Sequence, residues 1–215
     1  AFRAAFDEAD AAVDFDLKEV CFTDTAGVLS ETQYTQPCMT AFAAGLTAVL
    51  REAGVTPEYA AGLSLGEYSA LACAGVFDVQ TAVALTAFRG KAMAAAVSGP
   101  FHTSLMHPAG DALREKCKAV RFAPMQFPVL FNCLGHEIEE TDTIAALLEK
   151  QVQSGVRWEV TVRRLAELGV DTAIEIGPGR ALTGFVKKTV GSAISCYPVE
   201  TAAQLQQLLR TMKGA

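Results

Sequence analysis

Residues 62–66 carry the pattern in this chain that is most suggestive of covalent chemistry. The run Gly62-Leu63-Ser64-Leu65-Gly66 places a serine between two glycines, after a predicted strand and before a predicted helix. This is the nucleophile-elbow pattern, in which the glycines permit a tight turn that raises the serine hydroxyl above the sheet. The N–H of Leu65, at the N-terminus of the following helix, would then face a developing oxyanion. The five residues alone also fit an ordinary turn, but their context favours a nucleophilic Ser64.

A nucleophilic serine needs a general base, and the chain contains three histidines. His102 lies in the loop that opens a predicted helix, and His107 lies about one turn further along the same helix. His136 lies in a polar turn, which favours a structural or solvated side chain. Because α/β sites assemble on loops at the strand edge, His102 is the preferred base, with His107 as the open alternative.

Other polar residues are weaker candidates. Arg89 lies on a largely apolar predicted helix, where it either extends to the surface or clamps a substrate carboxylate through two parallel hydrogen bonds. Asp171 and Glu175 are candidates for a triad acid, although acids on strands are frequently caps or surface charges. The run Gly177-Pro178-Gly179 precedes a predicted helix and could bind phosphate, but a plain turn is the simpler interpretation.

The elements that must position these residues follow from hydrophobic periodicity and turn residues. We expect helices over 1–12, 35–53, 67–74, 78–93, from just beyond His102 to 118, 142–152, 158–168, after Gly179 and over 201–212. Thr35 is the expected N-cap of the second of these, with Pro37 in its first turn. Gly54, Gly75 and Gly169 are the expected stops of the helices over 35–53, 67–74 and 158–168. Strands are expected over 57–62, 127–131, 171–176 and 194–199, whereas 16–32 is expected to be a connection rich in turns. This alternation predicts an α/β fold with three layers and a mostly parallel sheet.

Composition limits the class of protein. The chain has 215 residues, of which 51% are hydrophobic, and its net charge of −6 argues against nucleic-acid binding. No apolar run reaches the ~18–20 residues of a membrane span, and residues 1–10 lack the apolar core of a signal peptide. The six cysteines are widely spaced, which predicts reduced thiols and a cytoplasmic protein rather than a disulfide or zinc framework.

Several segments closely resemble the malonyl-CoA:acyl carrier protein transacylases of fatty-acid synthesis, which are related to polyketide synthase acyltransferase domains. The similar segments occur in the order of that family and extend along the whole chain: Gln36-Pro37, 62–71, 88–93, 97–103, 156–158 and 175–184. This ordered series is far more specific than the elbow pattern by itself. The resemblance implies an α/β-hydrolase-like core within a single unit, 1–215.

The resemblance also implies roles for individual residues. Ser64 would accept the acyl group, His102 would be its base, and Arg89 would pair with the malonyl carboxylate. Gln151 falls where the family has a glutamine beside the histidine, whose neighbourhood orients the imidazole through a backbone carbonyl instead of a triad acid. Phe101 resembles malonyl-type enzymes, because a bulky ring leaves little room for an α-methyl group.

This chain departs from the family pattern in three places. Leu63 stands where many members have histidine, but that side chain is not the nucleophile. The family's N-terminal strand with its Gly-Gln-Gly loop, which supplies a second oxyanion donor, has no counterpart in 1–215. The family's small ferredoxin-like subdomain is also missing between the Arg89 helix and Val97. We therefore expect the natural polypeptide to carry further residues at a junction near 93–97.

The implied reaction moves a malonyl group from coenzyme A to the phosphopantetheine thiol of acyl carrier protein, without a metal or redox cofactor, in a monomeric enzyme. The acidic carrier could dock on Lys187 and Lys188, which are weak candidates. A second interpretation is a serine esterase of the α/β type, which would need Asp171 or Glu175 as the acid for His102. A third is a docking module for the carrier protein that forms no adduct on Ser64.

Overall fold

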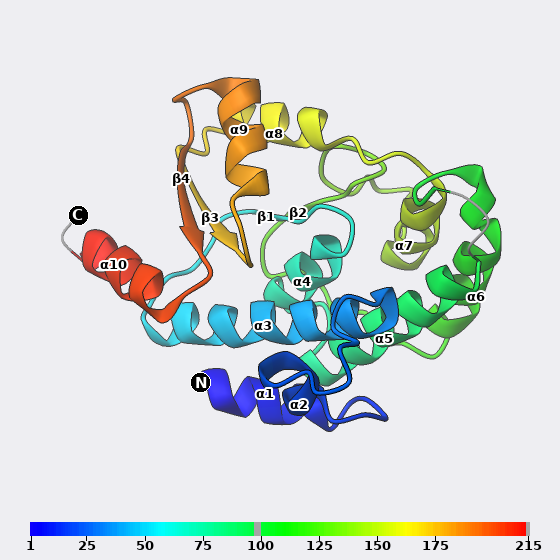
Figure 1. The fold of residues 1–215 in the computed structure, drawn as a ribbon. Helices are drawn as coiled ribbons and strands as arrows, with labels where there is room; N and C mark the ends of the chain where they lie inside the picture. Colours follow the sequence, from blue (N-terminus) through cyan, green and yellow to red (C-terminus); the bar gives the residue numbers. More distant parts are fainter. Residues whose placement is uncertain (97–99, 214–215) are drawn as a thin grey trace.

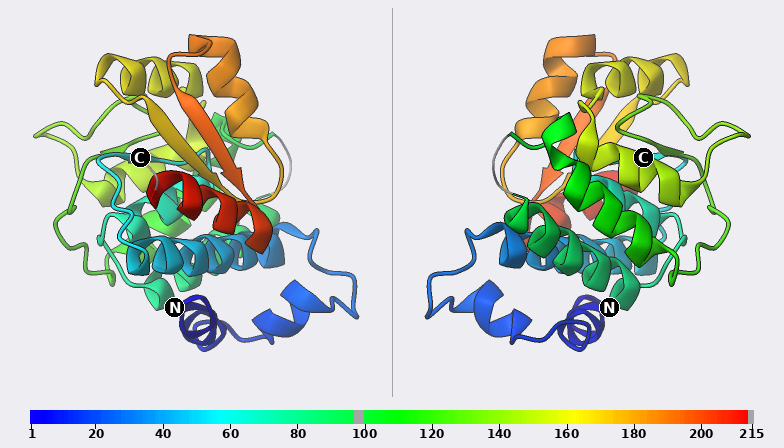
Figure 2. Two further views of the ribbon diagram at one scale, coloured as in Figure 1. Left: turned by 90° about the vertical axis from the view of Figure 1, so that its left-hand side faces the viewer. Right: turned by 90° about the vertical axis from the view of Figure 1, so that its right-hand side faces the viewer.

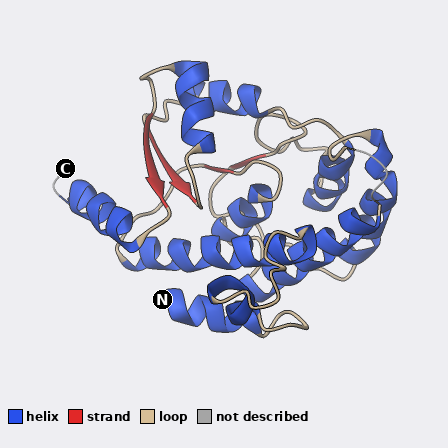
Figure 3. Cartoon of the chain, in the orientation of Figure 1, coloured by secondary structure: helices blue, strands red, loops and turns tan. Residues whose placement is uncertain are grey.

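The computed structural model describes residues 1–96 and 100–213. Val97–Gly99, which belong to one of the segments of family resemblance and to the expected junction, lie outside the described residues. Helices account for most of the described chain, and the strands are short (Figures 1 and 3). No helix in this described part is long and apolar enough to cross a bilayer.

Apart from α2, the helices follow the predicted order. In the first half of the chain they are α1 (Phe2–Asp10), α2 (Leu17–Phe22), α3 (Thr32–Glu52), α4 (Gly66–Cys73) and α5 (Val79–Ala95). The second half contains a short 3₁₀ segment, η1 (Ser104–Met106), and the helices α6 (His107–Cys117), α7 (Ile144–Gln153), α8 (Trp158–Glu167), α9 (Ala181–Val190) and α10 (Ala202–Lys213). The helix stops at Gly54, Gly75 and Gly169 are confirmed, each with a positive φ that favours glycine.

The strands form two separate parallel pairs within the described residues. The strand β1 (Ala60–Ala61) pairs with β2 (Val129–Leu130), and β3 (Thr172–Ile176) pairs with β4 (Ser195–Val199). The prediction of parallel strands is confirmed, but the prediction of one sheet is wrong for this part of the chain. One reason is that β1 and β2 are cut short. Gly62 begins the elbow after β1, and Pro128 has no N–H to donate before β2.

Three layers are present around the β3–β4 pair. Alternating side chains such as Ile174 and Ile176 pack with α3 and α10, where Leu46, Leu50 and Leu208 are buried. The opposite face, with Ala173 and Cys196, packs against α8 and α9 through Val162 and Val186. Figure 2 shows α10 crossing one face of the pair while α9 lies on the other. The layering predicted from the alternation of elements is therefore confirmed here.

The β1–β2 pair lies in the largest group of buried apolar residues. Val129 and Phe131 pack with Tyr68 and Leu71 of α4 and with Leu147 of α7. Because α4 packs against this core through Tyr68 and Leu71, its first turn and the preceding elbow have a defined position next to the end of β2. This packing sets the place of Ser64 relative to the rest of the chain.

Two local predictions are wrong near the N-terminus. Helix α3 begins at Thr32 rather than at Thr35, whose hydroxyl instead donates to the carbonyls of Leu29 and Glu31. Pro37 therefore lies inside the helix, where it lacks the N–H that would donate one turn back. Helix α2 lies in the segment predicted as a connection. Its six residues are too few to display a period, although the Asp16 side chain caps it by accepting the Glu19 N–H at 2.7 Å.

Candidate active site

The turn between β1 and α4 has the strained backbone expected of a nucleophile elbow. Ser64 has a φ of +52°, a left-handed conformation that costs a non-glycine residue about 1–3 kcal/mol. Gly62 is required here, because a Cβ at this position would lie 2.0 Å from the backbone of Gly66. A Cβ added at Gly66 would meet open space, so a larger residue is not excluded there by steric clash. The elbow therefore depends sterically on the first glycine of the pattern.

Ser64 and His102 are brought together although 38 residues separate them in sequence. The Ser64 Oγ lies 2.7 Å from His102 Nε2, and His102 Nδ1 lies 2.9 Å from the carbonyl oxygen of Gln151. Because a carbonyl only accepts, Nδ1 carries the proton and Nε2 is free to accept the hydroxyl proton. Like Ser64, His102 has a positive φ, of +60°. The arrangement is that of a serine with a neutral imidazole base.

The surroundings keep this imidazole in its neutral form. Burial lowers the pKa of His102 below its ordinary value of 6.5, and the charge of Arg89 lowers it further. The hydrogen bond to the Gln151 carbonyl acts in the opposite direction, but the balance is a lowered pKa. At neutral pH the side chain is thus unprotonated and able to take a proton.

The other candidates for base and acid lie elsewhere. His107 is exposed at the start of α6, and His136 bonds the carbonyl of Glu137 in a surface turn. Asp171 is exposed, and Glu175 accepts the N–H groups of Leu182 and Thr183 at 2.9 and 2.8 Å. Glu175 therefore caps α9, and the place that a triad acid would occupy at His102 Nδ1 is taken by the Gln151 carbonyl.

Arg89 is buried at the elbow and does not extend to the surface. Its side chain is 1% exposed, and Nη2 donates to Ser64 Oγ at 3.0 Å and to Gln151 Oε1 at 3.2 Å. Its Nη1 donates to Gln36 Oε1 at 2.6 Å, and the Tyr68 ring lies 5.6 Å from Cζ. A guanidinium held in this way offers a planar pair of donors beside the nucleophile, which suits a carboxylate.

Gln151 contacts each of the three neighbouring groups. Its carbonyl binds His102, its Oε1 accepts from Arg89, and its Nε2 donates to the Ser64 carbonyl at 2.8 Å. Gln36 was identified from the sequence only as part of the family resemblance. Its contact with Arg89 could not be read from sequence, because α3 and α5 lie 53 residues apart at this contact.

Two further polar residues of the site were missed by the sequence analysis. Asn132 is 1% exposed, and its Oδ1 accepts the Ser64 N–H at 2.6 Å while its Nδ2 donates to the Gly62 carbonyl at 2.7 Å. Glu67 is fully buried, and its Oε2 accepts the Asn132 N–H at 2.6 Å. The sequence did contain a signal for Asn132: it is a single amide directly after the apolar run 129–131, at the carboxyl end of a predicted strand, where the side chains of α/β sites gather.

The remaining predicted site residues have different surroundings. Leu65 is the N-cap residue of α4, and its N–H has no acceptor within the described part of the chain, which leaves it available to an oxyanion. The Phe101 ring is 44% exposed, and its influence on acyl selectivity stays a prediction. In the turn before α9, the Gly179 N–H is bonded to Glu200 Oε2 at 2.6 Å. A carboxylate at this position disfavours phosphate, so the plain-turn interpretation holds.

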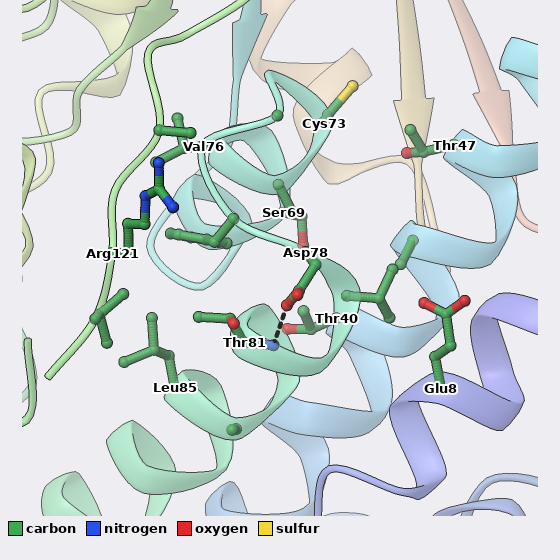
Figure 4. A pocket seen from close by; sticks show the side chains of 18 of the residues that line it. Glu8, Thr40, Thr47, Ser69, Cys73, Val76, Asp78, Thr81, Leu85 and Arg121 are labelled. Carbon is green, nitrogen blue, oxygen red and sulfur yellow. Dashed lines mark hydrogen bonds between the residues drawn. The ribbon is translucent and has the colours of Figure 1, made fainter.

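A cavity of about 790 Å³ lies away from this site, at the C-terminal end of α4 (Figure 4). Its lining includes Ser69 and Cys73 of α4 together with residues of α3 and α5. The Asp78 carboxylate on its wall accepts the Thr81 N–H and caps α5. Burial raises the pKa of the Cys73 thiol, which keeps the thiol protonated and weakly nucleophilic. Cys73 is therefore a poor nucleophile in this cavity.

Comparison with known proteins connects this site to a group of enzymes. A model of the acyl transferase domain matches residues 1–100. The malonyl CoA-acyl carrier protein transacylase of Bacillus subtilis (strain 168) is 28% identical over 285 aligned positions, which cover 99% of this chain and 90% of the relative. These positions outnumber the 215 residues of this chain, so the relative has residues where this chain has none.

Solved structures give the same picture. The malonyl CoA-acyl carrier protein transacylase of Clostridium perfringens superposes with a TM-score of 0.94 at 27% identity, over 99% of this chain and 89% of that one. MCAT from Streptococcus pneumoniae reaches 0.91 at 30% identity, over 98% and 91%. A malonyl-transacylase solved in complex with a type II PKS acyl-carrier protein reaches 0.91 at 28% identity, over 98% and 91%.

The mixed fold of helices and parallel strands and the matching domain model together define this chain as an acyltransferase. More particularly, the chain belongs to the malonyl CoA-acyl carrier protein transacylase family.

Proposed function

We propose that this enzyme transfers a malonyl group from malonyl-CoA to the phosphopantetheine thiol of an acyl carrier protein through an ester on Ser64. The observation that carries the proposal is the position of Arg89, whose Nη2 lies 3.0 Å from the same Ser64 Oγ that contacts His102. A buried cation at the nucleophile suits an acyl group that carries its own carboxylate. The names of the relatives support the same donor and acceptor.

In the first half of the reaction, the Ser64 hydroxyl attacks the thioester carbonyl while His102 Nε2 takes the hydroxyl proton. The Oγ–C bond forms, and the negative charge that develops on the carbonyl oxygen is stabilised by the Leu65 N–H and the N-terminus of α4. The C–S bond then breaks, and the coenzyme A thiolate takes the proton from the His102 imidazolium. The product is a malonyl ester of Ser64.

The second half repeats these steps with a different nucleophile. The carrier thiol gives its proton to His102 and attacks the ester carbonyl, so that a new C–S bond forms. The Oγ–C bond then breaks, and Ser64 recovers its proton from His102. The orientation of the imidazole by the Gln151 carbonyl serves both halves, because the same Nε2 must first accept and then donate a proton.

Arg89 would select the acyl group. The malonyl carboxylate would replace the neutral amide oxygens of Gln36 and Gln151 as acceptors, and charge-assisted hydrogen bonds of this kind are about twice as strong as neutral ones. An acetyl group cannot make this exchange, and a site built for a polar group discriminates strongly against an analogue that lacks it.

The esterase alternative is disfavoured by the same geometry. An acid to orient His102 is absent from its Nδ1 side within the described residues, and Glu175 is committed to capping α9. Water would then be the acyl acceptor, so rapid turnover of a simple nitrophenyl ester without any thiol would favour an esterase.

Brief exposure to malonyl-CoA followed by mass spectrometry of the digested protein tests the proposal. We expect a malonyl adduct on the Ser64 peptide that disappears when a carrier protein bearing phosphopantetheine is added. An adduct that forms equally well from acetyl-CoA, or one that only water removes, would contradict the proposed function.

We also propose that the family's small subdomain joins the chain between α5 and His102. The remaining residues would then form the α/β-hydrolase-like core that the resemblance implies. The end of α5 at Ala95 lies only a few residues before His102, and the Bacillus relative aligns over more positions than this chain contains. The second oxyanion donor would likewise come from residues outside 1–215. A natural polypeptide with an intact mass near 22.7 kDa would contradict the proposed insertion.

A further inference from the structure

We infer that Asn132 is a positioning residue for Ser64: its side-chain amide clamps the Gly62 and Ser64 backbone at the start of the elbow, while the buried Glu67 carboxyl holds Asn132 in place. The inference rests on the proposed use of Ser64 as the nucleophile. It assigns a task to two buried polar residues that the proposed reaction does not otherwise use.

The amide of Asn132 is arranged to hold the elbow in one conformation. Its Oδ1 accepts the N–H of Ser64 and its Nδ2 donates to the carbonyl of Gly62, so that both bonds span the start of the turn. Ser64 has a left-handed backbone conformation, and its strain would be relieved if the residue moved to another conformation. Two bonds from one rigid amide therefore oppose relaxation of the turn and keep Oγ directed at His102.

The position of Asn132 explains how it reaches the elbow. It follows β2, and the elbow follows β1, and these two strands are parallel partners. Because the carboxyl ends of paired parallel strands lie at the same edge, the amide and the turn are neighbours although 68 residues separate Asn132 from Ser64. Because this pairing fixes the ends of both strands, the amide and the turn are held in place by the sheet itself.

Glu67 completes the network from the other side. It lies in the first turn of α4, its Oε2 accepts the Asn132 N–H, and its own N–H donates to the Ser64 carbonyl at 3.2 Å. Its Oε1 is buried without a hydrogen-bond partner in the described residues. Burial raises the pKa of Glu67 to about 7, so that the carboxyl is partly neutral near this pH. A buried acid without a full set of partners is costly, which argues for a task beyond packing.

Asn132→Asp is the decisive variant, because a protonated aspartic acid reproduces the amide with one donor and one acceptor. Once ionised it offers two acceptors, repels the Gly62 carbonyl and places a negative charge beside the oxyanion. We expect the rate of Ser64 modification in this variant to fall relative to the wild-type rate as pH rises from about 5 to about 8, because the aspartic acid loses its proton over this range. The ratio of the two rates should change at least about tenfold over this range.

The measurement should use a fluorophosphonate probe as well as malonyl-CoA. The probe reports nucleophile and base without requiring malonyl recognition, so a wild-type protein that reacts with the probe but not with malonyl-CoA would end the proposed function while leaving the clamp testable. Asn132→Ala should slow labelling on the order of 100-fold, the usual effect of a nucleophile displaced by about 1 Å. Glu67→Gln retains an acceptor for the Asn132 N–H and should label within about threefold of wild type, whereas Glu67→Ala should not.

Cys133→Ala is the matched control, since it removes a buried side chain next to Asn132 whose one hydrogen bond in the described residues goes to the Leu147 carbonyl rather than to the elbow. Circular dichroism and melting curves establish that each variant is folded. If Asn132→Asp is folded and follows the wild-type pH profile, or if Asn132→Ala and Cys133→Ala slow labelling equally, Asn132 does not position Ser64 and the inference is wrong.

Discussion

Two turns in this molecule join a strand to a helix through glycines, and they differ in what occupies the helix N-terminus. The turn from β3 to α9 is closed by its own carboxylates, because Glu175 accepts two N–H groups of α9 and Glu200 accepts the Gly179 N–H. In the turn from β1 to α4, Glu67 instead faces Asn132, and the Leu65 N–H has no acceptor in the described residues.

This difference shows how a helix N-terminus is kept available for chemistry. Donors at the start of a helix attract any acid within reach, and a capped N-terminus cannot bind a developing negative charge. At the elbow this does not happen, because the Glu67 carboxylate is buried and accepts the Asn132 N–H instead of the Leu65 N–H. A pattern of glycines before a helix therefore identifies a possible site, but the direction of the neighbouring carboxylates decides whether the site is open.

The largest expected effect comes from removing the nucleophile of the open turn. Ser64→Ala should lower acyl transfer by about 10⁶-fold, since a serine and its base act as one unit. Ser69→Ala, in the same helix but at the distant cavity, should leave the rate unchanged. Single-turnover transfer from malonyl-CoA measures both. A Ser64→Ala protein that still transfers malonyl at a measurable rate would mean that the open turn is not the reacting centre.

Arg89 should account for the choice of acyl group at the open turn. Arg89→Ala should reduce the preference for malonyl-CoA over acetyl-CoA by on the order of 10³-fold, because the malonyl carboxylate loses its partner. Removal of this charge should also raise the pKa of His102, which moves the acid limb of the pH profile upward. Lys91→Ala, an exposed ion-pair residue on the same helix, is the control. An unchanged preference would show that selectivity arises elsewhere.

The buried acid of the open turn should make the protein less stable as pH rises. The pKa of Glu67 is raised from 4.5 to about 7, so between these values the folded state keeps a proton that the unfolded chain has released. The free energy of unfolding should therefore fall by about 3 kcal/mol across this window and stay low above it. Glu67→Gln should remove this part of the pH dependence in urea titrations at several pH values. A variant with the wild-type slope would show that Glu67 does not titrate in this range.

The closed turn should show a smaller effect, on stability only. Glu175→Ala removes the cap of α9 and should lower the free energy of unfolding by about 1 kcal/mol without changing transfer kinetics. Glu175→Gln keeps one acceptor and should lose less. A strong loss of activity in Glu175→Ala with the fold intact would revive the esterase interpretation, in which this acid supports His102.

Local patterns predicted most elements and one part of the site. The elbow was identified because its glycines, serine and flanking elements are contiguous, and the helix stops were identified because a positive φ selects glycine. Helix α2 was missed because six residues show no period. The start of α3 was misplaced because Thr35 fits a cap as well as it fits the bonds that it makes to Leu29 and Glu31.

The sequence by itself determined the order of the helices and strands apart from α2, together with the presence of a serine elbow, and its resemblance to a family nominated His102, Arg89 and Gln151. These signals are carried by neighbouring residues, whose spacing reflects local backbone geometry. Only the tertiary structure decided that Gln36, Asn132 and Glu67 meet at the elbow and that Glu175 does not. Contacts between distant segments depend on how the strands pair and the helices pack, and no local pattern encodes that pairing.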